Sequence, residues 1–291
     1  MWRGLALLAL AGCTYSADFN GARFACDSLT PCPDGIQCIE GYCQAPAIDA
    51  GEGPDAAGLP DAGNGDDRLR WIDHTVGSFD LSGADSVESD MIAGGPGDLF
   101  VVFVSTKPAR EVTGVSGLDL EWMEARQICS GRSTAKLAMF WGLTSVAVAG
   151  KVTAALGITA GDGGAVISVH RYAGADPSNP IGHTSVANST GHDGDLACSG
   201  GIDSDMYSWS ALDTAAIDSI VVSGVHTANY PSHAAGDGFT ERSDDQSGAT
   251  SSSAGVAVEE RRIAEPTSNV TVSGGWENAP DWAAIAAELR D

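Results

Sequence analysis

Basic residues are scarce in this sequence. Its 291 residues include 15 Lys and Arg against 39 Asp and Glu, which gives a formal charge of −24. A nucleic-acid backbone or an anionic bilayer would repel such a chain, because neither could exchange its counterions for the protein's charges. The charge therefore argues against nucleic acid as a partner.

Long apolar runs are also lacking. Beyond the N-terminus, no run approaches the roughly 18 residues that a membrane-spanning helix requires. Charged residues make up only 19% of the chain and glycine occurs 37 times, which suits turn-rich β-structure better than a helical bundle. Because 43% of the residues are hydrophobic, the chain can still bury a core.

The common catalytic signatures are absent too. The sequence has no Gly-x-Ser-x-Gly nucleophile elbow, no His-Glu-x-x-His zinc helix and no Gly-x4-Gly-Lys phosphate loop. This weakens an enzymatic interpretation without excluding it, because a glycosidase needs only two carboxylates about 5 to 10 Å apart. We assign no catalytic residue.

A lipidation motif is present at the N-terminus. A short apolar run leads into Leu10-Ala11-Gly12-Cys13, which resembles the lipobox of bacterial lipoproteins. The resemblance implies that residues 1–12 are a signal peptide and that Cys13 is acylated, making the bilayer a partner. The alternative is a cysteine that happens to end an ordinary secretion signal. We expect an exported protein, lipid-anchored at the bacterial cell envelope, at the outer membrane or cell surface.

Six cysteines remain after Cys13, an even number that suits disulfides in an oxidising compartment. Four of them lie within 18 residues and predict a small module, residues 13–44, that needs covalent staples. They are Cys26, Cys32, Cys38 and Cys43. Three pairings are possible and the sequence does not choose among them. A zinc site is the rival, although the first spacing is wider than in typical zinc loops. The segment resembles small cysteine-rich modules that follow the anchor in bacterial surface lipoproteins.

The last two cysteines, Cys129 and Cys198, each occur in Cys-Ser-Gly and lie 69 positions apart. We predict that they form a disulfide. A catalytic cysteine is the alternative, but neither has a clear activating partner nearby in the sequence.

Residues 45–70 are predicted to be a flexible linker rich in Asp, Ala, Gly and Pro. Six acids and no base fall between Asp49 and Asp67, and the segment has too few apolar residues to offset the entropy of ordering. A coil of this length spans on the order of 28 Å.

Residues 71–291 contain short β-prone runs separated by turn residues, which predicts an all-β domain. The run 99–104 is continuously apolar and suits a strand buried on both faces. Leu118, Leu120 and Trp122 alternate with acids, as in a half-buried strand. Further strands are expected at 136–143, 151–158, 165–172, 206–212, 219–225, 255–263 and 270–276.

The last segment gives conflicting signals. Trp282, Ile285, Ala286 and Leu289 share a helical face, yet a final strand fits the surrounding pattern. We predict a strand. About ten strands with little helical periodicity indicate a two-sheet sandwich or jelly roll.

Several segments resemble a β-sandwich module of secreted bacterial and phage-like surface proteins. They are residues 97–104, 112–118, 172–177, 179–182, 238–242 and 281–290. That group has no settled activity, so the resemblance implies fold and location and transfers no catalytic residue.

An acidic stretch is a candidate cation site. Its carboxylates could supply oxygen ligands to Ca²⁺, which accepts six to eight of them. They belong to Asp193, Asp195, Asp203 and Asp205. The alternative is a solvated acidic loop, and no cofactor is required.

Tyr207 and Trp209 are candidate ligand-binding residues. Their spacing places both on one face of a strand, opposite Met206 and Ser208. If that face points outward, it forms a small stacking platform; the alternative is inward packing. We expect a non-catalytic domain that binds an extracellular ligand such as a glycan, matrix or another envelope protein. The alternatives are a carbohydrate-active hydrolase on the same sandwich or a purely structural coat module.

Overall fold

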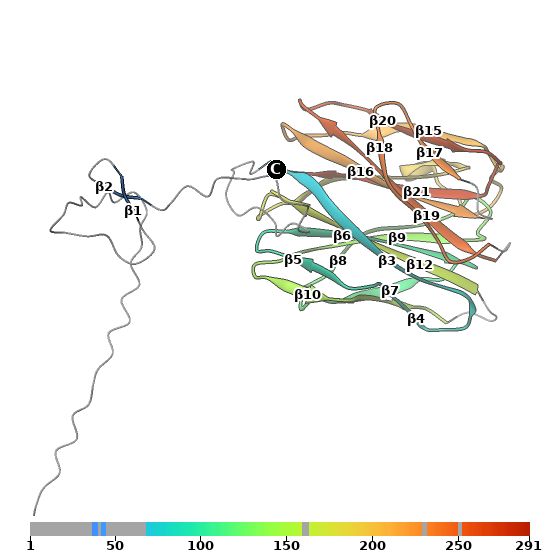
Figure 1. Cartoon of the computed structure of the whole chain (residues 1–291). Helices are drawn as coiled ribbons and strands as arrows, with labels where there is room; N and C mark the ends of the chain where they lie inside the picture. The colour runs from blue at the N-terminus through green and yellow to red at the C-terminus, as the bar shows by residue number, and fades with distance from the viewer. Residues whose placement is uncertain (1–36, 40–41, 45–67, 159–162, 229–231, 250–251) are drawn as a thin grey trace, which may run out of the picture. The chain divides into compact units, whose positions relative to one another are not determined.

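The computed structural model describes residues 37–39, 42–44, 68–158, 163–228, 232–249 and 252–291 (Figure 1). Contacts divide the chain between residues 64 and 65 into two units. In the first unit, β1 (Gln37–Ile39) and β2 (Tyr42–Gln44) form a hairpin in which Cys38 is opposite Cys43. Cys13, Cys26, Cys32 and residues 45–67 lie outside the described residues, so the predictions made for them stay predictions.

Among the described residues from 68 onward, the regular secondary structure is almost entirely β, as predicted, and the sheets stack in layers (Figure 1). The described residues contain no helix of the length and apolarity needed to cross a membrane.

The first half of this unit contributes a large and a small sheet. The large sheet has the order β3-β12-β6-β9-β8 and the small one β4-β11-β7, with a separate β5-β10 pair. The strands are β3 (Arg70–Ser82), β4 (Ser86–Glu88), β5 (Ile92–Gly94), β6 (Leu99–Lys107), β7 (Val112–Gly117), β8 (Met123–Cys129), β9 (Lys136–Leu143), β10 (Val148–Gly150), β11 (Val152–Leu156) and β12 (Gly163–Ala173).

The second half repeats this arrangement. Its large sheet has the order β14-β13-β21-β16-β19-β18 and its small sheet β15-β20-β17. The elements are β13 (Ile181–Asn188), β14 (Gly191–His192), η1 (Asp193–Asp195), β15 (Met206–Leu212), β16 (Ser219–Ala228), β17 (His233–Ala235), β18 (Thr240–Gln246), β19 (Ala254–Ile263), β20 (Val270–Trp276) and β21 (Trp282–Leu289). Apart from β14, both sheets match the order of the first half strand for strand.

The two halves also share their irregularities. A register shift occurs between Glu124 and Arg126 where β8 pairs with β9, and another between Glu241 and Ser243 where β18 pairs with β19. The pairs β3-β12 and β13-β21 each have a register shift near the first residues of β3 and β13, respectively. Bulges are built features that related folds retain, so we interpret the halves as two copies of one jelly-roll-like unit. The sandwich or jelly roll expected over residues 71–291 is confirmed, and this unit contains it twice.

Three apolar cores separate the four layers. The central core lies between the two large sheets and contains Phe103 from β6 and Ile285 from β21. One outer core lies between the first large sheet and β4-β11-β7, and the other between the second large sheet and β15-β20-β17. Gly224 on β16 permits the central contact, because a Cβ there would lie 2.2 Å from the Phe103 ring.

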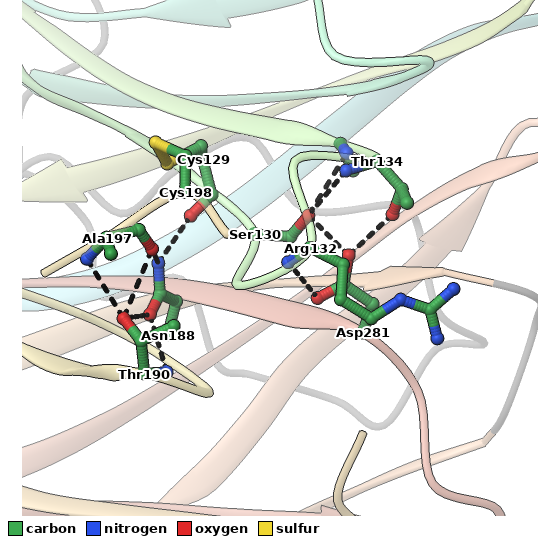
Figure 2. Close-up of a disulfide and its surroundings, with 10 residues drawn as sticks. Cys129, Ser130, Arg132, Thr134, Asn188, Thr190, Ala197, Cys198 and Asp281 are labelled. Carbon is green, nitrogen blue, oxygen red and sulfur yellow. Dashed lines mark hydrogen bonds between the residues drawn. A yellow bond between two sulfur atoms is a disulfide. The ribbon is translucent and has the colours of Figure 1, made fainter. Parts of the chain in front are cut away.

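The predicted disulfide between Cys129 and Cys198 is present and joins the two halves (Figure 2). Beside it, Asn188 Nδ2 donates to the backbone oxygens of Cys129 and Ala197, both at 3.0 Å. In the loop that follows Cys129, the hydroxyls of Ser130 and Thr134 donate 2.6 Å hydrogen bonds to Asp281. Figure 2 shows the resulting polar seam, in which residues of one half satisfy the backbone and side chains of the other.

The final segment is a strand, as predicted. β21 lies inside the second large sheet between β13 and β16, and all eight of its residues are buried. Ala283 and Ile285 face the central core, whereas Ala284 and Ala286 face the outer one. A strand covered on both faces needs no polar alternation, which explains its helix-like pattern.

The strand predicted around Leu118, Leu120 and Trp122 is wrong. These residues form the turn between β7 and β8, where Leu118 and Asp119 have positive φ angles of 58° and 52°. Leu120 N donates to Gly117 O at 3.3 Å and Trp122 Nε1 donates to the same oxygen at 3.0 Å. The alternation of burial is as expected, but a turn produces it.

Candidate functional site

The repeat supplies an internal standard for deciding which side chains the fold itself requires. In the first half, Val112 begins β7 and is paired with Leu156, the last residue of β11. In the second half, His233 begins β17 and is paired with Trp276, the last residue of β20. His233 therefore occupies the position that Val112 fills with an apolar side chain.

Two more positions differ in the same way. Val87 is paired with the residue that lies two positions before Leu156 on β11. Tyr207 is paired with the residue that lies two positions before Trp276 on β20. Phe140 is paired with the first residue of the bulge in β8. Glu259 is paired with the first residue of the matching bulge in β18. All three first-half residues (Val87, Val112 and Phe140) are in its outer core. An apolar core thus suffices for the fold, and the second half places Tyr, His and Glu there instead.

These three side chains form one hydrogen-bonded network. The Tyr207 hydroxyl donates to Glu259 Oε1 at 2.9 Å and lies 2.9 Å from His233 Nε2. His233 Nδ1 lies 2.6 Å from Glu241 Oε2, and Gly236 N donates to Glu259 Oε2 at 3.2 Å. The network therefore runs from a buried carboxylate, through a phenol and an imidazole, to a second carboxylate.

Burial distinguishes the two ends of the network. Glu259 and the His233 side chain have no exposed surface, whereas 35% of the Glu241 side chain is exposed. Burial, opposed by hydrogen bonds from Tyr207 and Gly236, raises the pKa of Glu259 from 4.5 to about 7. Burial and the neighbouring Glu259 raise the pKa of Tyr207 well above its usual value.

One shared proton completes the network. A tyrosine hydroxyl has a single hydrogen, and a neutral imidazole has one donor and one acceptor. If Glu259 is protonated, it donates to Tyr207, which donates to His233. If Glu259 is ionised, Tyr207 donates to it, and the contact between the Tyr207 hydroxyl and His233 Nε2 then needs a hydrogen from another source. Without that proton, one buried group loses its partner, which costs about 1–3 kcal/mol.

Aromatic rings surround the network. The Tyr207 ring centroid lies 5.1 Å from that of Trp276, 5.7 Å from Trp282 and 6.0 Å from Trp209, and it stacks on His233 at 5.9 Å. This cluster, Tyr207 with Trp209, Trp276, Trp282 and His233, is called the aromatic cluster below.

A pocket of about 260 Å³ opens beside the aromatic cluster, and Tyr207, Trp209 and Trp282 contribute to its lining. Its rim includes Met206 and Ile202, which are 68% and 79% exposed. The remaining lining is Ala187, Asn188, Ser189, Gly191, His192, Ser204 and Ser208. No carboxylate is among the described residues that line this pocket, which we call the Tyr207 pocket.

Tyr207 and Trp209 share a face, but it points inward. They are 3% and 4% exposed, whereas Met206 and Ser208 are exposed. An outward stacking platform is therefore not present, because these rings supply the core of the second sandwich. What a ligand can reach is the edge of the cluster that lines the pocket.

The four predicted cation ligands are not brought together in the part of the chain described. Asp193 accepts hydrogen bonds from Ser185 Oγ and Val186 N, and Asp203 pairs with Arg132 at 2.7 Å. Across the described residues no three His, Cys, Asp or Glu side chains are grouped to hold a metal. The backbone oxygen of Asp205 accepts a hydrogen bond from Trp276 N. The side chain of Asp195 is not among those that the structure describes.

Sequence reasoning missed His233, Glu241 and Glu259. A signal existed for Glu259, because it alternates with Val256 and Val258, which face the central core, and therefore shares the other inward face of β19 with Ile263. A carboxylate at an inward position needs a partner. His233 carried no such signal, since it lies among turn residues in the sequence.

Comparison with protein-family models, curated proteins and solved structures finds no match to this chain.

Proposed function

We propose that this chain is a lipid-anchored protein of a bacterial envelope whose β-sandwich head binds an extracellular glycan without catalysis. The Tyr207 pocket carries the proposal. Its volume of about 260 Å³ lies just below the 300–1,000 Å³ typical of sites for drug-sized ligands, which suits a single sugar ring. Aromatic edges can contact the apolar face of a sugar, and Asn, Ser and His side chains in the lining offer hydrogen bonds.

Binding is favoured over hydrolysis by the chemistry of the lining. A glycosidase needs two carboxylates flanking the scissile bond, whereas the described lining of the Tyr207 pocket contains none. The nearest paired acids in the network are committed elsewhere, since Glu259 is bonded to Tyr207 and Glu241 to His233. We therefore assign these residues a positioning role beneath the pocket.

Exposed methionines provide a matched test of binding. Met206→Arg would place a charged chain on the rim of the Tyr207 pocket, while Met91→Arg would make the same change at a site 63% exposed in the first half. In a glycan-array screen of the full chain followed by calorimetry, we expect Met206→Arg to weaken binding at least tenfold and Met91→Arg to leave it unchanged. Equal affinities, or no ligand on the array, would contradict the proposal.

The anchor is supported by the lipobox-like motif and tested separately. Cys13→Ala removes the sulfur that would be acylated, so we expect the protein to move from the membrane to the soluble fraction. Two or three acyl chains suffice for stable anchoring. Unchanged membrane partition of the variant would contradict the lipoprotein assignment and leave the pocket proposal intact.

A further inference from the structure

Arginines gather in one concave region of an otherwise acidic head. Residues 68–291 contain 29 acids and 13 bases, a net charge of −16. Four of those 13 bases, Arg70, Arg242, Arg261 and Arg262, line a single pocket of about 400 Å³ together with Glu260. This arginine pocket shares no lining residue with the Tyr207 pocket.

Two of the guanidinium groups are held in place. Arg242 pairs with Glu260 at 2.5 Å and lies 4.7 Å above the centroid of the Trp71 ring. Arg262 Nη1 donates to Asp218 Oδ1 at 3.0 Å, and its Nη2 donates to the backbone oxygen of Leu69. The walls of the pocket are thus ordered before any ligand arrives, which lowers the entropic cost of binding.

Arg261 differs from these two. Within the described residues its side chain makes no ion pair or hydrogen bond, and its guanidinium lies against Gly238, where a Cβ would come 3.3 Å from Nε. Glu260 is the only acid among the described residues that line this pocket, although acids outnumber bases two to one in the head. Glu260 and Asp218 already balance the charges of Arg242 and Arg262, so the Arg261 guanidinium is the group in this pocket that can attract a bound anion.

We infer that the arginine pocket binds the carboxylate, sulfate or phosphate group of an acidic saccharide. The planar guanidinium fork matches the oxygens of such groups with two parallel hydrogen bonds. Trp71 lines the same pocket and its ring holds the Arg242 guanidinium in place. The inference does not depend on the Tyr207 pocket.

Calorimetry on the full chain tests this inference with four probes: galacturonate oligomers, sulfated oligosaccharides, neutral glucose oligomers, and inorganic sulfate or phosphate. We expect an acidic saccharide to bind, neutral oligomers to bind at least tenfold more weakly at this site, and affinity to fall as salt increases. Inorganic anions binding as tightly as the saccharides would overturn the saccharide assignment. The absence of binding by every anion would overturn the site.

Arg261→Ala locates the site. The variant removes a side chain without a described partner, so it should fold, which a thermal unfolding curve checks. We expect affinity for the acidic saccharide to fall tenfold or more, and Arg261→Lys to restore only part of it, because an ammonium group lacks the planar fork. Arg126→Ala is the matched control, because this exposed arginine bonds to Thr184 elsewhere on the head. Equal losses in the Arg261 and Arg126 variants would overturn the assignment.

Discussion

At the scale of single residues, the comparison between the halves shows which buried side chains the fold requires and which it does not. Val87, Val112 and Phe140 show that these three register positions can be apolar. Tyr207 and Glu259 occupy two of the matching positions and bring a buried carboxylate into the second core. A buried polar group is costly unless it is hydrogen-bonded, and both oxygens of Glu259 have a partner, Tyr207 on Oε1 and Gly236 on Oε2.

Glu259→Gln tests the shared proton. Because the pKa of Glu259 is raised from 4.5 to about 7, the folded state keeps a proton that the unfolded state releases in this range. Stability should therefore fall as pH rises from about 4.5 to 7 and level off above it, by up to about 3 kcal/mol. Urea unfolding at pH 5 and pH 8 should show this loss in the wild type and not in Glu259→Gln.

The exposed Glu265 provides the control for that measurement. Glu265→Gln should keep the wild-type dependence on pH. If Glu259→Gln also keeps it, the network does not hold the proton.

At the scale of elements, sequence patterns identified many of the strands, but β3, β8, β13 and β18 were not among those expected. The apolar run at 99–104 and the segment at 136–143 became β6 and β9. The turn at Leu118 and Asp119 was missed because the apolar alternation through Leu120 and Trp122 was given more weight than the turn signal of Gly117. The helical pattern of β21 misleads because both faces of that strand are buried.

The disulfide joins the two halves, so its removal should lower the stability of the whole head. The double variant Cys129→Ser and Cys198→Ser opens a loop of 69 residues, which the chain-entropy relation values at about 4 kcal/mol. We expect denaturant unfolding to show a loss of this order. An unchanged unfolding midpoint would mean that the other contacts of the seam hold the halves without it.

Close packing of β6 against β16 makes a second prediction at this scale. Gly224→Ala would place a methyl group 2.2 Å from the fully buried Phe103 ring. We expect a loss of about 1–3 kcal/mol, typical of overpacked cores. Gly114→Ala is the matched control, because a Cβ at Gly114 meets no atom within 4 Å. Thermal unfolding of both variants should show a lowered midpoint for Gly224→Ala only.

At the scale of the whole molecule, the charge divides unevenly along the chain. Residues 1–67 carry 10 acids and 2 bases, a net of −8, and residues 68–291 carry the remaining −16. Within that acidic head the arginine pocket is a local exception. Neither this pocket nor the Tyr207 network was predicted from the sequence, because each gathers residues from strands far apart in the chain.

The repeat itself was not visible in the sequence for a related reason. Matching positions hold different residues, such as Phe140 and Glu259 or Phe103 and Gly224, so sequence similarity between the halves is weak. Strand order and bulge positions preserve the relationship, because they depend on backbone pairing and tolerate changes of side chain.

Indole N–H resonances of the full chain test the central claim most directly. The chain has seven tryptophans, of which Trp209 and Trp282 line the Tyr207 pocket, while Trp141 packs on the central core. When a glycan selected on the array is titrated in, we predict that the Trp209 and Trp282 signals shift and that the Trp141 signal does not. Shifts confined to other tryptophans, or no shift at saturating glycan, would contradict ligand binding at the Tyr207 pocket.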